Sequence, residues 1–296
     1  MNLLYLTFGD NIRNHTQAYF SIYSFLAKGI QPASLNIITD KPRYYKSIEK
    51  QVNIIEANAA LLKEWMGPYQ FFWRVKIKAI EKLCHMYTGE PVLYLDSDTF
   101  FYGTSRDYED LSRSEQAIMF ENEGPLKELP SKTMKTMSAQ LKNLPIAGLS
   151  NLSEWNMWNA GVVFTPNRRD AKEMELALAL CDGMCGNKVK DQFAEQFALS
   201  VALQHLYGLR SADNTIAHYW SNKEQWNEVI RTFFIECQML GLDFEEQLKK
   251  YREINIHNYP VVRISRSTNR KLKQKVDQIF GDKKIEYLKP PLPIKH

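Results

Sequence analysis

The sequence predicts an α/β fold with a mixed, mostly parallel sheet flanked by helices. Two observations carry this prediction. Short apolar runs alternate with segments of helical periodicity through the first third of the chain, as in repeated strand-helix units. The run Val92–Leu95 is apolar throughout, which is typical of a central strand covered on both faces. A chain of 296 residues can bury the core that such a sheet needs.

The elements follow in order along the chain. Apolar runs that favour β structure predict strands at 3–8, 35–39, 52–55, 92–95, 117–120 and 161–164. Helical periodicity predicts helices at 16–26, 42–50, 71–87, 171–181 and 192–206. Gly89-Glu90-Pro91 ends the third of these helices. The stretch 124–153 is too long for a plain connection, so we expect a lid or an acceptor loop there.

Charge is distributed unevenly. The formal net charge is +4, but from Arg263 onward the chain carries ten basic and three acidic residues. We therefore predict a catalytic domain at 1–262 and a basic C-terminal extension at 263–296. The extension is either a solvated tail or a patch that meets anionic lipid or a polyanionic substrate. No nucleic-acid partner is expected.

Four scattered cysteines indicate a reducing compartment, which we take to be the cytoplasm: Cys84, Cys181, Cys185 and Cys237. Two of them stand at helical spacing without a second Cys/His pair, so buried hydrophobic side chains are favoured over zinc ligands. The N-terminus lacks the pattern of a signal peptide, and no run is long enough to cross a bilayer. We expect a soluble protein or one that lies on a membrane surface.

Two carboxylates directly follow the predicted central strand, at Asp96 and Asp98. In parallel sheets the ligand crevice lies at the carboxyl ends of the strands. Ser97 between them lets both side chains turn toward one point, and two hard oxygen ligands suit Mg²⁺ or Mn²⁺ holding a diphosphate. The alternative is an acidic turn that only ends the strand.

This segment resembles the strand-terminal Asp-x-Asp of the GT-A glycosyltransferases, specifically those of family 8, and the resemblance covers most of residues 1 to 226. Further segments fit it in order. Thr7-Phe8-Gly9 looks like the family's nucleotide-binding turn. Phe72-Trp73-Arg74 with Lys78 looks like the helix start that presents an Arg to the nucleotide sugar.

Three more segments complete the resemblance. Asn159-Ala160-Gly161 is similar to the strand entry whose Asn contacts the donor sugar, and Asp191-Gln192 to the pair at the next helix start. His218 is similar to the family's third metal ligand, and Lys223 to its cation for the leaving phosphate. This last segment departs from the pattern, because Ser221 replaces a Gly and the Lys comes one residue early.

Each match has a structural alternative. Arg74 and Lys78 fit an exposed stripe one helical turn apart, Asn159 and Asp191 fit caps, and His218 fits a satisfied core histidine. The ordered co-occurrence of these signals favours one site over separate structural roles.

The resemblance implies a metal-dependent glycosyltransferase of the GT-A fold that uses Mn²⁺ or Mg²⁺. It implies ligands at Asp96, Asp98 and His218, and a UDP-hexose donor, UDP-galactose or UDP-glucose. It also implies retention of anomeric configuration, with Gln192 at the reacting face and Asp191 on the sugar hydroxyls. The acceptor is expected to be a glycan or a lipid-linked glycan at the inner membrane face.

Two other functions compete. Asp96-Ser97-Asp98-Thr99 also fits a haloacid dehalogenase-type phosphatase with Asp96 as nucleophile. That motif normally opens the chain, whereas three strand-helix units precede it here. The second rival is a nucleotide-sugar or glycan-binding protein without turnover. The joint presence of both aspartates with Asp191 and His218 favours an enzyme.

Overall fold

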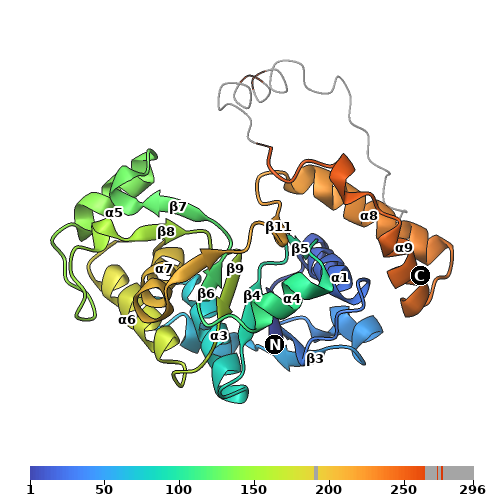
Figure 1. Cartoon of the computed structure of the whole chain (residues 1–296), viewed down its shortest axis with the longest axis horizontal. Helices are drawn as coiled ribbons and strands as arrows, with labels where there is room; N and C mark the ends of the chain where they lie inside the picture. Colours follow the sequence, from blue (N-terminus) through green and yellow to red (C-terminus); the bar gives the residue numbers. More distant parts are fainter. Residues whose placement is uncertain (190–192, 264–271, 273–274, 276–296) are drawn as a thin grey trace, which may run out of the picture.

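The computed structural model describes residues 1–189, 193–263, 272 and 275, and a seven-stranded sheet forms its centre (Figure 1). In spatial order the strands are β10 (Leu209–Ser211), β6 (Ala117–Met119), β9 (Val162–Thr165), β4 (Val92–Leu95), β1 (Asn2–Thr7), β2 (Ser34–Thr39) and β3 (Asn53–Glu56). Strands β1 to β4 are mutually parallel and β10 is parallel to β6, while β9 runs antiparallel to β4 and β6. The prediction of a mixed, mostly parallel sheet is confirmed.

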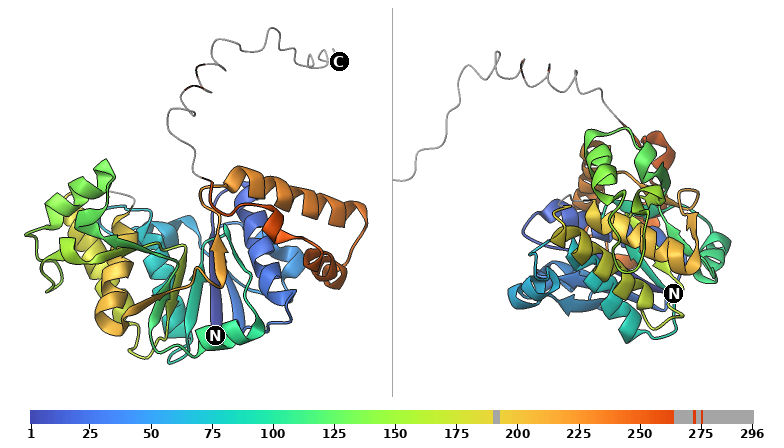
Figure 2. Two further views of the ribbon diagram at one scale, coloured as in Figure 1. Left: turned by 45° about the horizontal axis from the view of Figure 1, so that its top comes forward. Right: turned by 90° about the vertical axis from the view of Figure 1, so that its left-hand side faces the viewer.

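Two helical layers cover the sheet, one on each side (Figure 2). Alternate residues of the central strands belong to two different cores, one under each layer. Leu3 and Leu93 are paired in register and lie in the core under α1 (Ile12–Leu26), α8 (Lys223–Met239) and α9 (Phe244–Arg252). Leu4 and Tyr94 form the next pair, in the core under α3 (Arg74–Met86), α6 (Lys172–Gly186) and α7 (Ala194–Tyr207). The apolar run 92–95 is buried on both faces, as its sequence predicts.

Helix boundaries differ from the predictions mainly where polar caps act. Helix α1 begins at Ile12 rather than at residue 16, because the Asn11 side chain accepts a hydrogen bond from the Arg13 N–H. The helix predicted at 42–50 is a 3-10 segment, η1 (Pro42–Ile48). Two short capped helices were not predicted, α2 (Ala59–Trp65) and α4 (Ser105–Ser112).

The long stretch at 124–153 is a folded lobe at one end of the sheet (Figure 1). Strand β7 (Asn122–Pro125) pairs antiparallel with β8 (Asn156–Trp158). Between them lie η2 (Leu126–Glu128), α5 (Lys132–Leu141) and η3 (Leu152–Glu154). The lobe has its own buried side chains, including Met134, Met137 and Leu141, so it is a packed part of the body.

The chain after the sheet returns to the N-terminal half. Strand β5 (Thr99–Phe101) pairs antiparallel with β11 (Ile216–His218), and α8, α9 and η4 (Ile256–Asn258) follow. Helices α8 and α9 pack on α1, so this half keeps one core up to the end of α9. The division at residue 262 stays a prediction, since nearly all of the extension lies outside the described residues.

In the described part of the chain, no helix has both the length and the apolar character that crossing a bilayer requires. The four cysteines are buried and none is in a disulfide, in agreement with their interpretation as hydrophobic side chains.

Candidate metal centre and adjoining pocket

Three potential metal ligands meet at the carboxyl end of β4. Asp96 and Asp98 directly follow that strand, and His218 ends β11. The β5–β11 pairing sets His218 opposite Thr99, and the Tyr219 N–H donates to the Asp98 carbonyl at 3.1 Å. One ligand atom from each of the three side chains lies within 4.8 Å of the others. The fold therefore brings together the three residues that the sequence proposes as ligands, although 120 residues separate the last from Asp98.

Asn159 fixes the orientation of His218. The Gly161 N–H donates to Asn159 Oδ1 at 3.0 Å, which identifies that atom as the amide oxygen. His218 Nδ1 lies 3.1 Å from the same oxygen and must donate its proton there. In the neutral ring Nε2 then carries a lone pair, and it lies 3.4 Å from Asp98 Oδ2. A lone pair and a carboxylate that face each other repel, and a cation bound between them removes this repulsion.

Gly161 makes this arrangement possible sterically. A Cβ atom at residue 161 would lie 2.2 Å from His218 Cε1 and 2.3 Å from Nδ1. The imidazole therefore occupies the space that any other side chain would need. The absence of a side chain at residue 161 lets the third candidate metal ligand, His218, approach the backbone closely.

Asp98 is buried, and its side chain is 5% exposed. Burial alone would raise the pKa of this carboxyl, but His218 and Lys223 outweigh it and hold the pKa well below its usual value. Lys223 Nζ, at the start of α8, lies 2.8 Å from Asp98 Oδ2 without the alignment of a hydrogen bond. Asp98 therefore stays ionised and keeps an oxygen available to a ligand.

A buried cation that sequence reasoning missed lies beside Asp96. Lys76 Nζ is 3.3 Å from Asp96 Oδ1, 3.5 Å from Glu195 Oε1, and donates to the Ala160 carbonyl at 3.1 Å. The Tyr94 hydroxyl donates to the same Asp96 oxygen. One carboxylate oxygen of Asp96 is thus held by two neighbours, which fixes how the group faces the cluster.

Two sequence signals could have identified this pair. Lys76 lies on the inward face of α3, four and seven residues before the buried Ile80 and Leu83. Glu195 lies three and four residues before the buried Ala198 and Leu199 of α7. Both are charged residues at core positions, which are rarely buried without a partner. Only the fold shows that they are each other's partners.

Two predicted cations lie in other ion pairs. The Arg74 guanidinium donates to Asp182 Oδ1 at 2.8 Å and to the Trp65 carbonyl at 2.8 Å. Lys78 is paired with Glu81 one turn along the same helix. Carboxylates outside the metal cluster therefore compensate both charges. The cation that the structure places beside Asp96 is Lys76, two residues after Arg74.

A pocket of about 400 Å³ opens in front of the two aspartates. Within it the Thr7 hydroxyl lies 2.7 Å from the Tyr45 hydroxyl, and the Ser97 hydroxyl donates to Gln17 Oε1. Both polar groups already have protein partners. The described lining comprises Leu6, Thr7, Phe8, Asn14, Phe72, Trp73, Val75, Lys76, Tyr94, Asp96, Ser97, Asp98 and Lys223.

The turn after β1 is held from two sides. The Gly9 N–H donates to Asp40 Oδ1 at 2.9 Å, and His15 Nε2 lies 2.9 Å from the Gly9 carbonyl oxygen. Gly9 has a φ of +77°, which favours glycine. The turn is therefore preorganised at the edge of the pocket.

A glutamine that the sequence analysis did not single out, Gln196, lies beside the Asn159-Ala160-Gly161 segment. Gln196 Oε1 lies 3.5 Å from the Ala160 N–H, and Gln196 Nε2 lies 3.4 Å from Glu123 Oε1. A described side-chain amide thus stands beside the β9 entry. Asp191 and Gln192 lie outside the described residues, and their roles stay predictions.

Removing the Lys76 charge tests the buried cluster. In Lys76→Met, the buried carboxylate of Glu195 and the partly exposed one of Asp96 lose their shared cation, so we expect the free energy of unfolding to fall by roughly 3–5 kcal/mol. Chemical denaturation at neutral pH measures this. Lys82→Met on the same helix is the control and should cost much less. Equal losses in both variants would contradict the proposed compensation.

Glu195 gives the fold a pH dependence. Burial raises the pKa of this carboxyl from 4.5 to about 7, against the opposing effect of Lys76. The folded chain therefore binds this proton more tightly than the unfolded chain. The free energy of unfolding should fall by roughly 3 kcal/mol as pH rises through this interval and then level off. Denaturation at several pH values with metal chelated should show this slope in wild type and in the exposed control Glu224→Gln. The slope should be absent in Glu195→Gln.

Comparisons with known proteins give structural matches alone. No family model matches the chain, and no curated protein matches it. One similar solved structure is the galactosyltransferase LgtC in complex with donor and acceptor sugar analogues, at 13% identity and a TM-score of 0.46, covering 72% of this chain and 73% of that one. Another is the glycosyltransferase GlyE in Streptococcus pneumoniae TIGR4, at 15% identity and a TM-score of 0.41, covering 71% of this chain and 45% of GlyE. Both are glycosyltransferases, the class that the sequence motifs resemble. At this level of similarity the functional argument rests on the chain's own residues.

Proposed function

We propose that this chain is a metal-dependent glycosyltransferase that moves a hexose from a nucleotide sugar to a glycan or glycolipid acceptor. The observation that carries the proposal is the convergence of Asp96, Asp98 and His218 at the mouth of the pocket beside β4. Two carboxylates and one imidazole are a ligand set that suits Mn²⁺ or Mg²⁺. The lone pair of His218 Nε2 facing the Asp98 carboxylate fits a bound cation.

Each residue of the centre has a part in this proposal. A divalent cation held by the three ligands would act as a Lewis acid on the donor diphosphate. Lys223 is half exposed at the start of α8 and can move from Asp98 to a phosphate oxygen as negative charge develops. Lys76 holds Asp96 and the Ala160 carbonyl in place, so the wall beside the sugar is rigid before the donor binds.

The outer end of the pocket suits a nucleobase. Phe72 and Trp73 are 47% and 44% exposed, and the Phe72 ring packs edge-on against Phe8 with centroids 6.1 Å apart. Exposed aromatic rings beside a phosphate site offer a stacking surface for a base. This supports a nucleotide-sugar donor, and the family resemblance makes UDP-galactose and UDP-glucose the first candidates.

The stereochemical part of the proposal is retention of anomeric configuration. It rests on the family resemblance of Asp191 and Gln192, which lie outside the described residues. Product analysis by proton NMR, with the coupling constant of the new anomeric proton as readout, tests it. An inverted product would exclude retention.

The phosphatase alternative is disfavoured by the state of Asp98. In that mechanism the second aspartate of the motif has to hold and donate a proton. Here the neighbouring side chains of His218 and Lys223 hold the pKa of Asp98 well below its usual value, so it is ionised at neutral pH. An ionised Asp98 fits metal ligation better than proton donation.

Donor hydrolysis without an acceptor tests the proposed function. Purified protein is incubated with UDP-galactose or UDP-glucose and with Mn²⁺, Mg²⁺ or a chelator, and released UDP is measured. We expect slow release that depends on the metal. Phosphate release from p-nitrophenyl phosphate would instead indicate the phosphatase. Mn²⁺ and nucleotide binding without UDP release, with glycan acceptors also present, would indicate a binding protein.

We also propose that the chain is cytoplasmic and that its basic extension contacts the membrane. Nearly all of the extension lies outside the described residues. Co-sedimentation of the full chain and of residues 1–262 with phosphatidylglycerol vesicles tests the contact. Equal binding by both would rule out the extension as the contact.

A further inference from the structure

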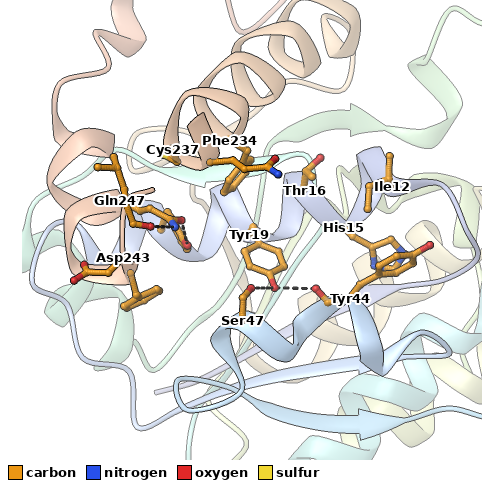
Figure 3. A pocket seen from close by; sticks show the side chains of 14 residues that line it. Ile12, His15, Thr16, Tyr19, Tyr44, Ser47, Phe234, Cys237, Asp243 and Gln247 are labelled. Atoms are coloured by element: carbon orange, nitrogen blue, oxygen red, sulfur yellow. Dashed lines mark hydrogen bonds between the residues drawn. The ribbon is translucent and has the colours of Figure 1, made fainter. Parts of the chain in front are cut away.

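A second cavity, of about 600 Å³, lies between α1, η1 and the α8–α9 pair (Figure 3). It shares no lining residue with the pocket in front of Asp96 and Asp98. Its volume is in the range of small-molecule sites. The described lining is Ile12, His15, Thr16, Tyr19, Tyr23, Tyr44, Ser47, Phe234, Cys237, Gln238, Leu242, Asp243, Phe244 and Gln247.

Two tyrosine hydroxyls of this cavity, those of Tyr19 and Tyr23, already have partners in the protein. The Tyr19 hydroxyl donates to the Tyr44 carbonyl at 2.8 Å and lies 2.7 Å from Ser47 Oγ (Figure 3). The Tyr23 hydroxyl donates to Gln247 Oε1 at 2.8 Å. Only the apolar faces and edges of these rings remain for a ligand.

The polar side chains at the α1 wall are satisfied in the same way. His15 Nδ1 lies 3.1 Å from the Tyr45 hydroxyl, and its Nε2 lies 2.9 Å from the Gly9 carbonyl oxygen. The Thr16 hydroxyl donates to the Arg13 carbonyl. A ligand that needs directed hydrogen bonds, such as a sugar or a nucleoside, would find no free buried donor or acceptor on this wall.

The charged residues of the lining also argue against an anionic ligand. No lysine or arginine stands among the described lining residues. Asp243 is the one acidic residue there, and its carboxylate accepts the Glu246 N–H at 2.9 Å as the cap of α9. The lining therefore offers no compensation for a phosphate or carboxylate inside the cavity.

The rim is open to solvent and mixed in character, because the lining residues Ser47, Gln238 and Asp243 are exposed as well as Ile12. Ile12, a lining residue, is 52% exposed. Met239 and Leu240 directly follow the lining residue Gln238 at the end of α8, and they are 81% and 65% exposed. Large apolar side chains held in water beside an aromatic cavity indicate an interaction site.

We propose that this cavity binds the alkyl chain of a single-chain amphiphile, with the polar head group at the rim. The chain would lie against Phe234, Phe244 and the tyrosine rings, which offer dispersion contact and no competing polarity. A peptide or a second protein copy fits less well, because its backbone amides would lose water against walls that cannot pair with them. The inference does not depend on the proposed transferase activity.

Calorimetric titration with alkyl maltosides below their micelle concentrations tests the proposal. Dodecyl maltoside should bind at one site per chain with a negative heat-capacity change, and octyl maltoside at least tenfold more weakly. Maltose, the head group without a chain, should not bind. Equal binding of maltose, or no saturable binding of dodecyl maltoside, would overturn the proposal.

A cavity-filling variant locates the site. Gln238 is exposed, so Gln238→Trp adds an indole to the cavity without removing a core contact, and we expect dodecyl maltoside affinity to fall at least tenfold. Arg231→Trp, two turns earlier on α8 and outside the lining, should leave it unchanged. Ser47→Trp and its neighbour Lys46→Trp repeat the comparison from the η1 side, with thermal melts to verify folding. Undiminished binding in both filled variants, or a chain dimer that Gln238→Trp disrupts, would overturn the assignment.

Discussion

Replacing Asp98 by asparagine is expected to lower metal-dependent UDP release by ~10²–10³-fold while the chain remains folded. The change deletes the carboxylate charge that lies 2.8 Å from Lys223 Nζ and faces His218 Nε2, and it conserves the shape of a side chain that is 5% exposed. Lys223 is half exposed, so its ammonium can turn to solvent when its partner becomes neutral. The loss should therefore appear in metal affinity and turnover more than in folding.

The sign of the Asp98 contribution to the free energy of unfolding follows from its pKa. The pKa of Asp98 is lower in the folded chain, so its carboxylate stabilises the fold at neutral pH, and that contribution is lost as pH falls through the folded pKa. Asp98→Asn loses it at every pH. Asp110→Asn, an exposed carboxylate on α4, is the matched control for charge and should keep full activity. Wild-type turnover of Asp98→Asn at saturating Mn²⁺ would refute the metal assignment.

The parts of the site that sequence could predict are those that a strand positions locally. Asp96 and Asp98 follow an apolar run that can only be a buried strand, and the carboxyl end of that strand is where ligands bind in parallel sheets. The fold class follows from the same periodicity. Local pattern was therefore enough to place two of the three proposed ligands.

The parts that local sequence pattern could not place, including the His218 that the family resemblance proposed, depend on contacts between distant segments. His218 reaches Asp98 only through the pairing of two three-residue strands, β5 and β11, which are too short to give a periodic signal. Lys76 and Glu195 meet from separate helices, 119 positions apart. The sequence motif drew attention to Arg74, whose partner Asp182 lies on a third helix.

Gly161→Ala is expected to weaken Mn²⁺ binding by ~10–100-fold, through the position of His218. The new Cβ would lie 2.2 Å from His218 Cε1, 2.3 Å from Nδ1 and 2.8 Å from Nε2. The ring cannot compress, so it must leave its place against Asn159 and turn Nε2 away from Asp98. Mn²⁺ affinity measured by electron paramagnetic resonance reports this without relying on turnover.

Two further variants distinguish the effect of steric crowding from the effect of losing a metal ligand. Gly183→Ala, on α6, places a Cβ 2.1 Å from Ile146 Cγ2. This variant should therefore be less stable than the wild type and should keep the same Mn²⁺ affinity. Gly161→Ala with His218→Ala removes the ring that the methyl group meets. Stability should then recover by about 1–3 kcal/mol relative to Gly161→Ala, while Mn²⁺ affinity stays low. Normal Mn²⁺ affinity in Gly161→Ala would mean that His218 is not a ligand, and the glycine would then serve only the packing of a core histidine.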